Sequence, residues 1–517
     1  MTTKRVLCLL LAVFLIACCF AGCGKQPTGQ TGAHPAEMTT LSDLSNKKIG
    51  IVTGTMTALL VPKLVPDAHY IEFNSTADVI IALESGKIDA FPTDESIYLA
   101  MLWEGNSVDR VAEALACSDY GILFGKGKNL PLQQQVNAYI AKIREDGRFN
   151  ALQEKWFGDS EPEEFVSYDN LTGENGTLKV GICSATKPFT YVKNGKYAGY
   201  DIEIIVDFCK EYGYALEFED TLFASILAGV SSGNYDIGLS GFTITDERKE
   251  SVDFSDIYHT EDLVFVFKAD SASQQKDFLD SMKASFEKTF IRESRWKLIT
   301  EGICNTMLIS VCAVMGGSLL GFALYMLARS KTKWLSGLVK SIAKVYATII
   351  AGTPTLVVLM ILFYIVFSSA DMSGIVVAII GFTLTFGSYV YENLALTVSG
   401  VDNGQLEAAY ALGYSRNFAF FRIILPQAMK MFLPGYSGEI VSLIKATSVV
   451  GYITVNDLTK MGDIIRSNTY EAFFPLIAVA VIYFAITWLI AGLLGILRRK
   501  AEPKRRKNKN ILKGVVR

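Results

Sequence analysis

Residues 407–426 read EAAYALGYSRNFAFFRIILP, and they lie between two long apolar segments of the chain. The small side chains of Ala408, Ala409 and Ala411 allow a short helix to lie flush in a groove of another protein. Gly413 ends such a helix with a turn, and Glu407 near the helix start can accept backbone donors there. The stretch therefore predicts a docking helix between two apolar segments.

Five apolar segments have the length of membrane spans, since a transmembrane helix needs about 20 largely apolar residues. They lie near 303–328, 340–367, 375–399, 432–453 and 473–497. Gly352 and Pro354 predict a bend or break in the second segment. Basic residues follow the first, third and fifth segments: Arg329, Lys331, Lys333, Arg416, Arg422, Lys430 and the tail 499–517. Because basic loops stay in the cytoplasm, the docking helix is predicted to lie inside and the N-terminal half outside.

The stretch resembles the EAA motif of the permeases of ATP-binding-cassette (ABC) importers, with matching spacing to Leu425 and Pro426. Ala351–Thr355 and Glu439–Ser448 resemble two further segments of the polar amino acid (histidine/glutamine-type) branch, and the likeness spans about 296–498. The resemblance implies a membrane domain of about five transmembrane helices, placed at 301–498. It also implies that six residues couple the chain to an ATPase: Glu407, Ala408, Ala409, Gly413, Leu425 and Pro426.

An ATP site of its own is not expected in this chain. No G-x-x-x-x-G-K-[ST] motif occurs, so ATP and magnesium are expected in a separate cytoplasmic ATPase, and no catalysis is expected here. No Cys/His cluster has metal-ligand spacing. The net charge of −3 argues against a nucleic-acid partner. Five spans make half of the family's assembly, so a second permease chain, as a homodimer, is expected.

The first 23 residues have the layout of an export signal. Lys4 and Arg5 precede an apolar stretch, and Phe20–Cys23 resembles the bacterial lipoprotein signal, which implies cleavage before Cys23 and its lipidation. The alternative is an uncleaved anchor with a free Cys23. Either arrangement places the following residues outside the cytoplasm, at the bacterial inner membrane. Residues 24–40 are polar and predict a tether.

The soluble half, 41–268, contains two segments that are similar in sequence. Ala82–Ala90 and Gly229–Ile237 both read as a helix end, a glycine turn and a strand. Strands at Lys48–Val52 and Leu178–Ile182 open the two units. Alternating strands and helices predict an α/β domain of two lobes.

Both units resemble the family-3 extracellular solute-binding proteins, a type II periplasmic-binding-protein fold, but in inverted order. Residues 178–268 match the first lobe and 41–158 match the second lobe and the ending; 159–177 form a linker, and 269–300 connect to the membrane. The order indicates a circular permutation, which domains with neighbouring termini tolerate; two truncated copies are the alternative. The permutation predicts that the crossing near Cys117–Tyr120 is kept and the other is cut, with both attachments at the hinge.

The resemblance also implies a ligand site for an amino acid. Arg248 matches the clamp for the α-carboxylate, which suits a bidentate guanidinium, and Asp94 matches the acceptor of the α-ammonium. Other matching residues are Thr243, Thr55 and Ser240, with Phe189 and Phe223 as pocket walls or core residues. Cys183 stands where basic-amino-acid and glutamine binders often have Asp. A buried cation without a counter-ion is costly, so a neutral or polar amino acid is favoured.

The sequence predicts the binding and permease subunit of an ABC importer. A transmembrane sensor is one alternative, but the tail after Lys500 is too short for a signalling enzyme. A ligand-gated channel is another, but such channels place their pore between the lobes, whereas here all spans follow both lobes.

Overall fold

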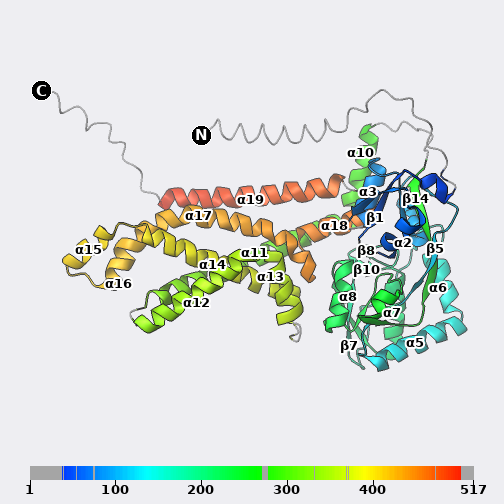
Figure 1. Ribbon diagram of the computed structural model, residues 1–517, viewed down its shortest axis with the longest axis horizontal. Coiled ribbons are helices and arrows are strands. Elements are labelled where there is room, and N and C mark those ends of the chain that lie inside the picture. Colours follow the sequence, from blue (N-terminus) through cyan, green and yellow to red (C-terminus); the bar gives the residue numbers. More distant parts are fainter. Residues whose placement is uncertain are drawn as a thin grey trace.

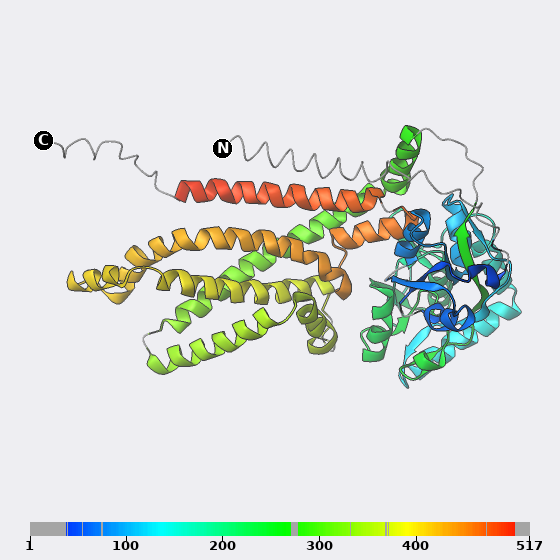
Figure 2. The same cartoon turned by 45° about the horizontal axis from the view of Figure 1, so that its top comes forward.

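The computed structural model describes residues 38–501, apart from 39, 54, 74–75, 270–277, 331, 368–369, 371 and 472. An α/β region lies at one end of the molecule and a long helical region extends from it (Figures 1 and 2). The signal segment with Cys23 and the tail beyond Ala501 lie outside the described residues, so both remain predictions.

The second lobe is built on a mixed sheet with the order β2-β1-β3-β14-β4, and β5 also pairs with β14. Its strands are β1 (Lys48–Val52), β2 (His69–Phe73), β3 (Ala90–Asp94), β4 (Val108–Arg110), β5 (Ala116–Tyr120) and β14 (His259–Lys268). Its helices are the 3-10 helix η1 (Leu41–Leu44), α2 (Met56–Leu64), α3 (Thr76–Glu84) and α4 (Glu95–Trp103). Ile49, Ala90 and Phe265 are fully buried, because these strands lie inside the sheet with helices packed on it.

The first lobe has the strand order β11-β7-β12-β6-β13 and a separate antiparallel sheet β10-β9-β8. The strands are β6 (Leu123–Gly125), β7 (Thr177–Ile182), β8 (Ala185–Thr186), β9 (Thr190–Lys193), β10 (Lys196–Ala198), β11 (Ala215–Asp220), β12 (Ile237–Gly238) and β13 (Val252–Phe254). The helices are α5 (Leu130–Glu145), α6 (Arg148–Trp156), α7 (Tyr200–Tyr212), α8 (Phe223–Ser232) and α9 (Asp246–Lys249).

The two similar segments, 82–90 and 229–237, each form the predicted helix end, glycine turn and strand. In the second lobe α3 leads through Gly86, at φ +69°, into β3, and in the first lobe α8 leads through Gly233, at φ +89°, into β12. Glycine adopts this left-handed conformation at little cost and so ends both helices. The helix–glycine–strand prediction is confirmed.

The two halves along the chain do not coincide with the two lobes. β6, α5 and α6, from the 41–158 half, belong to the first lobe, and β14, from the 178–268 half, lies inside the second-lobe sheet. Two strands therefore cross between the lobes, β5 leading into β6 and β13 leading into β14. Each half needs the other to complete its sheet, which favours one permuted domain over two truncated copies.

The prediction of a cut crossing with attachments at the hinge is wrong. His259 pairs with Tyr120 near the crossing, whereas Lys268, at the other end of β14, pairs with Val108. A strand rises about 3.3 Å per residue, so the exit at Lys268 lies well away from the hinge. Local sequence patterns do not determine which distant strands pair. The order of the motifs therefore could not show that β14 lies inside the second-lobe sheet.

The helical region begins with a connector, α10 (Phe278–Phe286), the π-helix η2 (Glu287–Ile291) and the 3-10 helix η3 (Arg292–Ser294). Long helices follow: α11 (Trp296–Ala328), α12 (Lys333–Gly352), α14 (Gly374–Ser399), α17 (Leu425–Ala446) and α19 (Phe473–Ala501). Shorter elements join them: α13 (Thr355–Ile361), η4 (Leu362–Val366), α15 (Asn403–Ala411), α16 (Arg416–Ala419), η5 (Phe420–Ile424), η6 (Thr447–Ile453) and α18 (Leu458–Thr469).

Among the described residues four helices are long and apolar enough to cross a membrane, or five if the bent run from Arg416 to Thr469 counts as one. The predicted break at Gly352 and Pro354 is confirmed, but the segment 340–367 is not one helix. α12 starts earlier, at Lys333, and ends at Gly352, because Pro354 lacks an N–H donor and favours an extended preceding residue.

Small residues set the closest packing in the helical region. A Cβ at Gly317 would meet the Gly387 nitrogen at 2.9 Å, and one at Gly321 would meet the Gly387 carbonyl oxygen at 2.6 Å. Such close approach is the usual way for helices to associate in lipid. α11 and α14 therefore form the centre of the helical region, and α12 and α19 lie at its edges (Figure 1).

Candidate functional site

Asp94 lies at the carboxyl end of β3, where it precedes α4. The Tyr120 hydroxyl donates to its Oδ1 at 2.6 Å. Burial, and then the nearby Glu261 carboxylate, raise the pKa of Asp94 to about 7, while Tyr120 and Arg248 oppose the rise. A buried carboxylate with this pKa gains a proton near neutrality unless a cation joins it.

Glu261 lies on β14 beside this carboxylate. It accepts from the Ser96 backbone nitrogen at 2.7 Å and from the Ser96 hydroxyl at 3.0 Å, and His259 Nε2 lies 3.5 Å from its Oε1. β14 belongs to the crossing, so the second-lobe side of the site is built directly onto the hinge strand.

Arg248 reaches the site from α9 of the first lobe. Its backbone nitrogen donates to the Thr245 hydroxyl that caps this short helix, and its guanidinium donates to the Thr243 carbonyl at 2.8 Å. The guanidinium also lies 5.8 Å from the ring centre of Phe223 and 5.5 Å from that of Phe242. Burial lowers the pKa of Arg248, and Asp94 is the first of the charges that oppose this. The lobes thus bring the predicted clamp and the predicted ammonium acceptor into electrostatic range.

The remaining predicted ligand residues lie around this pair. Thr55 caps α2, where its hydroxyl accepts from the Ala58 nitrogen at 3.4 Å. Phe223 stacks on Phe242 with ring centres 4.3 Å apart. Thr243 lines an open cavity of about 900 Å³ together with Met56, Ser118 and other residues near the crossing strands.

Two predicted ligand residues, Phe189 and Ser240, are buried beneath the cavity residues. Phe189 is 2% exposed and stacks on Tyr120 at 5.4 Å, so it reaches Asp94 through that ring. The Ser240 hydroxyl accepts from the Cys183 nitrogen at 2.8 Å and bonds to the Thr190 hydroxyl at 2.7 Å. These side chains support the floor of the site in this arrangement of the lobes.

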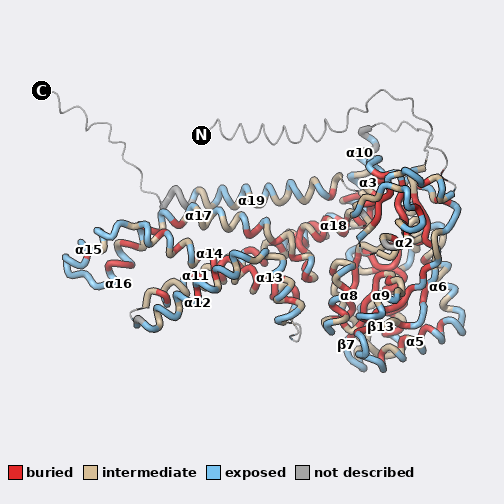
Figure 3. Tube along the Cα trace, viewed as in Figure 1, coloured by how far each residue is buried: buried red, intermediate tan, exposed pale blue. Residues whose placement is uncertain are grey.

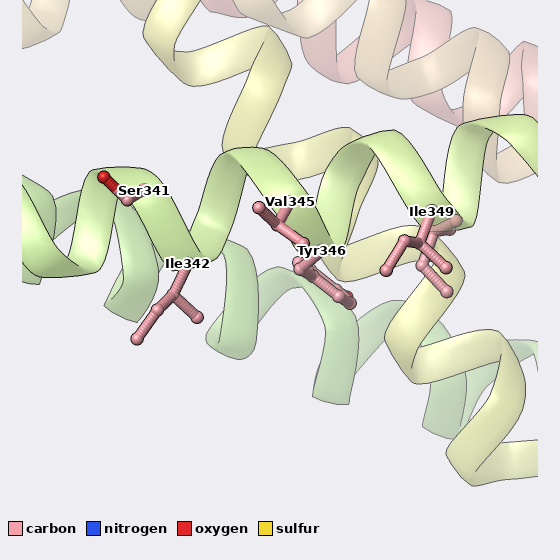
Figure 4. A pocket seen from close by; sticks show the side chains of 6 residues that line it. Ser341, Ile342, Val345, Tyr346 and Ile349 are labelled. Atoms are coloured by element: carbon pink, nitrogen blue, oxygen red, sulfur yellow. The ribbon is translucent and has the colours of Figure 1, made fainter.

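A second hollow lies far from these residues, on the membrane helix α12. It measures about 500 Å³ and is lined by Ser341, Ile342, Val345, Tyr346, Ile349 and Ile350 (Figure 4). Ile342, Val345 and Ile349 are each more than half exposed. All six lining residues lie on α12 and none lies between the lobes, so the hollow is separate from the ligand residues.

The predicted docking helix is α15, at the end of the molecule opposite the α/β domain (Figure 1). Asp402 caps it by accepting from the Gly404 nitrogen at 2.9 Å. The prediction that Glu407 accepts donors near the helix start is wrong, because α15 begins at Asn403 and Glu407 lies in its middle. Gly413 follows the helix at φ +82°. Ala409 is buried, whereas Glu407 and Ala408 are exposed. Leu425 and Pro426 begin α17, where proline is well tolerated.

Apolar side chains surround this helix end and face outward. Leu412 is 75% exposed, and Tyr410, Tyr414 and Phe418 are each 44% exposed. Arg329, at the end of α11, lies 3.8 Å from the Phe420 ring centre and donates to the Arg416 carbonyl. Exposed apolar groups on a well-anchored loop mark a surface for a protein partner.

Sequence reasoning missed two features at the other end. One is a buried ion pair between the lobes, Lys187 to Glu104 at 2.7 Å, which connector residues Lys288 and Arg292 approach. The other is α18, whose apolar residues Leu458, Met461, Ile464 and Ile465 carry a helical period that could have revealed an amphipathic helix.

The fold and these sites define a membrane permease with a two-lobed receptor attached to it. Residues 313–503 match the family model for binding-protein-dependent transport system inner membrane components. Residues 178–355 match the model for bacterial extracellular solute-binding proteins, family 3, beginning where the first-lobe motifs begin and running on through α12 to the start of α13.

Similar proteins agree with this class. The chain is 34% identical over 207 residues to the putative glutamine transport system permease protein GlnP of Rickettsia bellii, covering 92% of that protein and 39% of this chain. It is 33% identical over 203 residues to the probable amino-acid ABC transporter permease protein YckA of Bacillus subtilis, covering 88% of that protein and 39% of this chain. A crystal structure of an amino acid ABC transporter with histidines aligns at 30% identity, 44% of this chain, 100% of that chain and TM-score 0.37.

The chain belongs to the family of binding-protein-dependent transport system inner membrane components, and it carries a family-3 solute-binding domain in front of the permease. It is a multi-pass inner-membrane protein with that domain outside the cytoplasm, and a transport subunit, not an enzyme.

Proposed function

We propose that the chain is the receptor and permease subunit of an ABC importer for a polar or neutral amino acid. The observation that carries the proposal is the position of two sites at opposite ends of one helical bundle. Arg248 and Asp94 face each other between the lobes at one end, and α15 projects at the other. The names of the relatives, a glutamine and an amino-acid permease, support an amino acid as the cargo.

The ligand is held by complementary charges from the two lobes. Arg248 binds the α-carboxylate, with Thr243 and Thr55 completing its surroundings, and Asp94 receives the α-ammonium. Ser240 supports the floor of the site. Phe223 and Phe189 lie on the side-chain side. Cys183 offers no counter-ion to a cationic side chain, which favours a neutral or polar one.

A cytoplasmic ATPase supplies the energy. It binds the surface around Glu407 to Pro426, and ATP and magnesium reside in that partner. A second copy of this chain completes the channel, since one chain holds at most five spans within its described residues. Cys23, if lipidated, adds a second anchor in the outer leaflet.

The channel alternative is weaker. A ligand-gated channel needs its pore segments between the lobes, and here β14 leaves the second lobe before the first long helix begins.

Reconstitution tests the proposal. The full chain is co-expressed with its candidate ATPase, purified as a complex and placed in liposomes, and uptake of labelled amino acids is measured with and without internal or external ATP. Arg248→Ala in the same complex serves as the matched control. Uptake that needs ATP on the α15 side and Arg248 on the other supports the proposal; amino-acid flux without ATP would favour a channel.

A further inference from the structure

We propose that α18 is a docking helix that holds both lobes of the receptor at once and passes their closure to α11 and α19. This inference rests on the proposed function, since it concerns the consequence of ligand binding. It assigns the coupling to one extracytoplasmic helix of the same chain, and chiefly to Lys460 and Arg466.

The first lobe contacts α18 along its whole length. Lys460 is 5% exposed; its Nζ lies 3.3 Å from Asp220 Oδ1 and donates to the Thr221 carbonyl at 3.3 Å. Met461 and Ile464 pack with Val192 of β9 in a shared apolar cluster. Asn468 donates to the Val192 carbonyl at 3.1 Å.

The second lobe is held by the C-terminal part of the same helix. The Arg466 guanidinium pairs with Asp78 in the first turn of α3. Tyr470, just beyond the helix, is 4% exposed and belongs to the apolar core around Val79 and Leu83. A helix of only 12 residues thus has separate anchors in each lobe.

The opposite face of α18 is fixed to the membrane helices. Leu458 and Ile465 pack with Ile299 of α11. A Cβ at Gly302 of α11 would lie 2.7 Å from the Leu458 Cα, and one at Gly462 would lie 2.4 Å from Val479 of α19. The Gly302 contact brings two backbones together, whereas the Gly462 contact is with the Val479 side chain. Close-packed contacts transmit strain, so α18, α11 and α19 are expected to move together.

A capping network strengthens this attachment. Asp457 accepts from the Thr459 and Lys460 backbone nitrogens, both at 3.0 Å, and from the Tyr483 hydroxyl of α19 at 3.0 Å. The preceding helix run turns by 54° into α18, so α18 lies across the receptor instead of continuing a span.

Lys460 is connected to the surroundings of the ligand site through Asp220. Asp220, its partner, accepts from the Ser184 nitrogen at 3.1 Å and from the Ser184 hydroxyl at 2.5 Å. Ser184, the partner of Asp220, follows Cys183 in the chain. Thr221, whose carbonyl accepts from Lys460, lies two residues before Phe223. Both contacts of the Lys460 ammonium are therefore close in sequence to residues predicted near the ligand. Lys460 is a positioning residue: it acts through Asp220 and does not itself reach the ligand.

Lobe movement must therefore act on α18. If the lobes rotate about β5 and β14, the Asp220 and Asp78 anchors separate or approach, and α18 either tilts with them or loses one. Coupling of this kind is reciprocal, so the state of the permease also changes ligand affinity, typically by about 5- to 150-fold.

The test uses the full chain in nanodiscs with a mixture of the proteinogenic L-amino acids as probe. Calorimetry measures binding, and amide hydrogen exchange is followed in peptides from 296–305 and 473–483. In the wild type the probe changes exchange at both helix ends. In Lys460→Met and Arg466→Met the probe still binds, affinity shifts by about fivefold or more, and the exchange change is lost. Lys63→Met, an exposed lysine on α2, behaves as the wild type.

A double variant guards against misfolding. Removing one partner of a buried pair leaves an uncompensated charge, whereas removing both is better tolerated; Lys460→Met with Asp220→Asn keeps the fold and still loses the exchange change. If the probe binds and the exchange change survives in all variants, the proposal is overturned while the proposed function stands. If calorimetry detects no binding to the wild type, the proposed function fails and this inference falls with it.

Discussion

The two helices proposed to dock partners, α18 and α15, differ sharply in exposure. Nine residues of α18 are buried, whereas Ala409 is the buried residue of α15 (Figure 3). Both are short, both follow an aspartate cap and both end at a residue with positive φ, Tyr470 or Gly413. The two helices have similar lengths, caps and ends, so their difference in burial comes from the segments that pack on them.

The partner of α18 belongs to the same chain, and the proposed partner of α15 does not. Lys460 and Arg466 find carboxylates of the receptor, which makes burial of these charges tolerable. Leu412, Tyr414 and Phe418 have no such cover and stay exposed. The exposed surface of α15 is therefore where we expect the separate ATPase subunit to bind.

The strongest way to break this comparison is to reverse the charge at Glu407. We expect Glu407→Lys to abolish uptake and leave ligand affinity unchanged, because the substitution alters only the exposed surface of α15. Transport by reconstituted complexes and calorimetry on the same samples check this. Glu154→Lys, the same reversal on exposed α6, serves as control. Normal uptake by Glu407→Lys at normal membrane levels contradicts a docking role for α15.

The ligand end is tested by Arg248→Ala. A ligand carboxylate then lies unpaired in a desolvated cleft, which costs about 2–5 kcal/mol, or about 30- to several-thousand-fold in affinity. Asp94→Ala is expected to act similarly through the ammonium. Lys210→Ala, which removes an exposed cation on α7 of the same lobe, is the control and has no effect. Wild-type affinity in both site variants, measured by calorimetry, places the ligand elsewhere.

Proton binding at Asp94 separates the two ends of the molecule further, because it affects ligand binding between the lobes and not the surface of α15. The carboxylate must lose its proton to receive an ammonium, and its pKa is raised to about 7. Affinity is therefore full above this pH and falls as pH drops through it, by about tenfold between pH 8 and pH 6. Stability of the empty domain moves the other way and falls as pH rises from 3.8 toward about 7. Asp94→Asn should bind weakly with no such pH profile.

The smallest effect is expected from Gly413→Ala. A Cβ there meets nothing within 4 Å, so only the left-handed conformation at φ +82° is penalised, by about 1–2 kcal/mol. Uptake should fall partially, well short of the loss in Glu407→Lys, in the same transport assay. A complete loss in Gly413→Ala would mean that the turn itself, and not the helix surface, carries the contact.

Local patterns predicted the parts of the molecule that are local. The end of α15 at Gly413, the break before Pro354 and the helix–glycine–strand units all follow from residues within a few positions of each other. The pairings of Lys460 with Thr221 and of Arg466 with Asp78 join residues 239 and 388 positions apart. Such contacts depend on how the lobes meet the helices, and so do the placement of β14 and the Lys187–Glu104 pair.

The exit of the chain from β14 toward α11 has a kinetic consequence. A receptor tied to its own permease docks at an effective concentration in the millimolar range, whatever its abundance in the cell. Docking at α18 can then be weak enough to reverse at every turnover and still be saturated. A free receptor would have to reach that concentration in solution to compete, so the tether protects this importer from the receptors of other transporters.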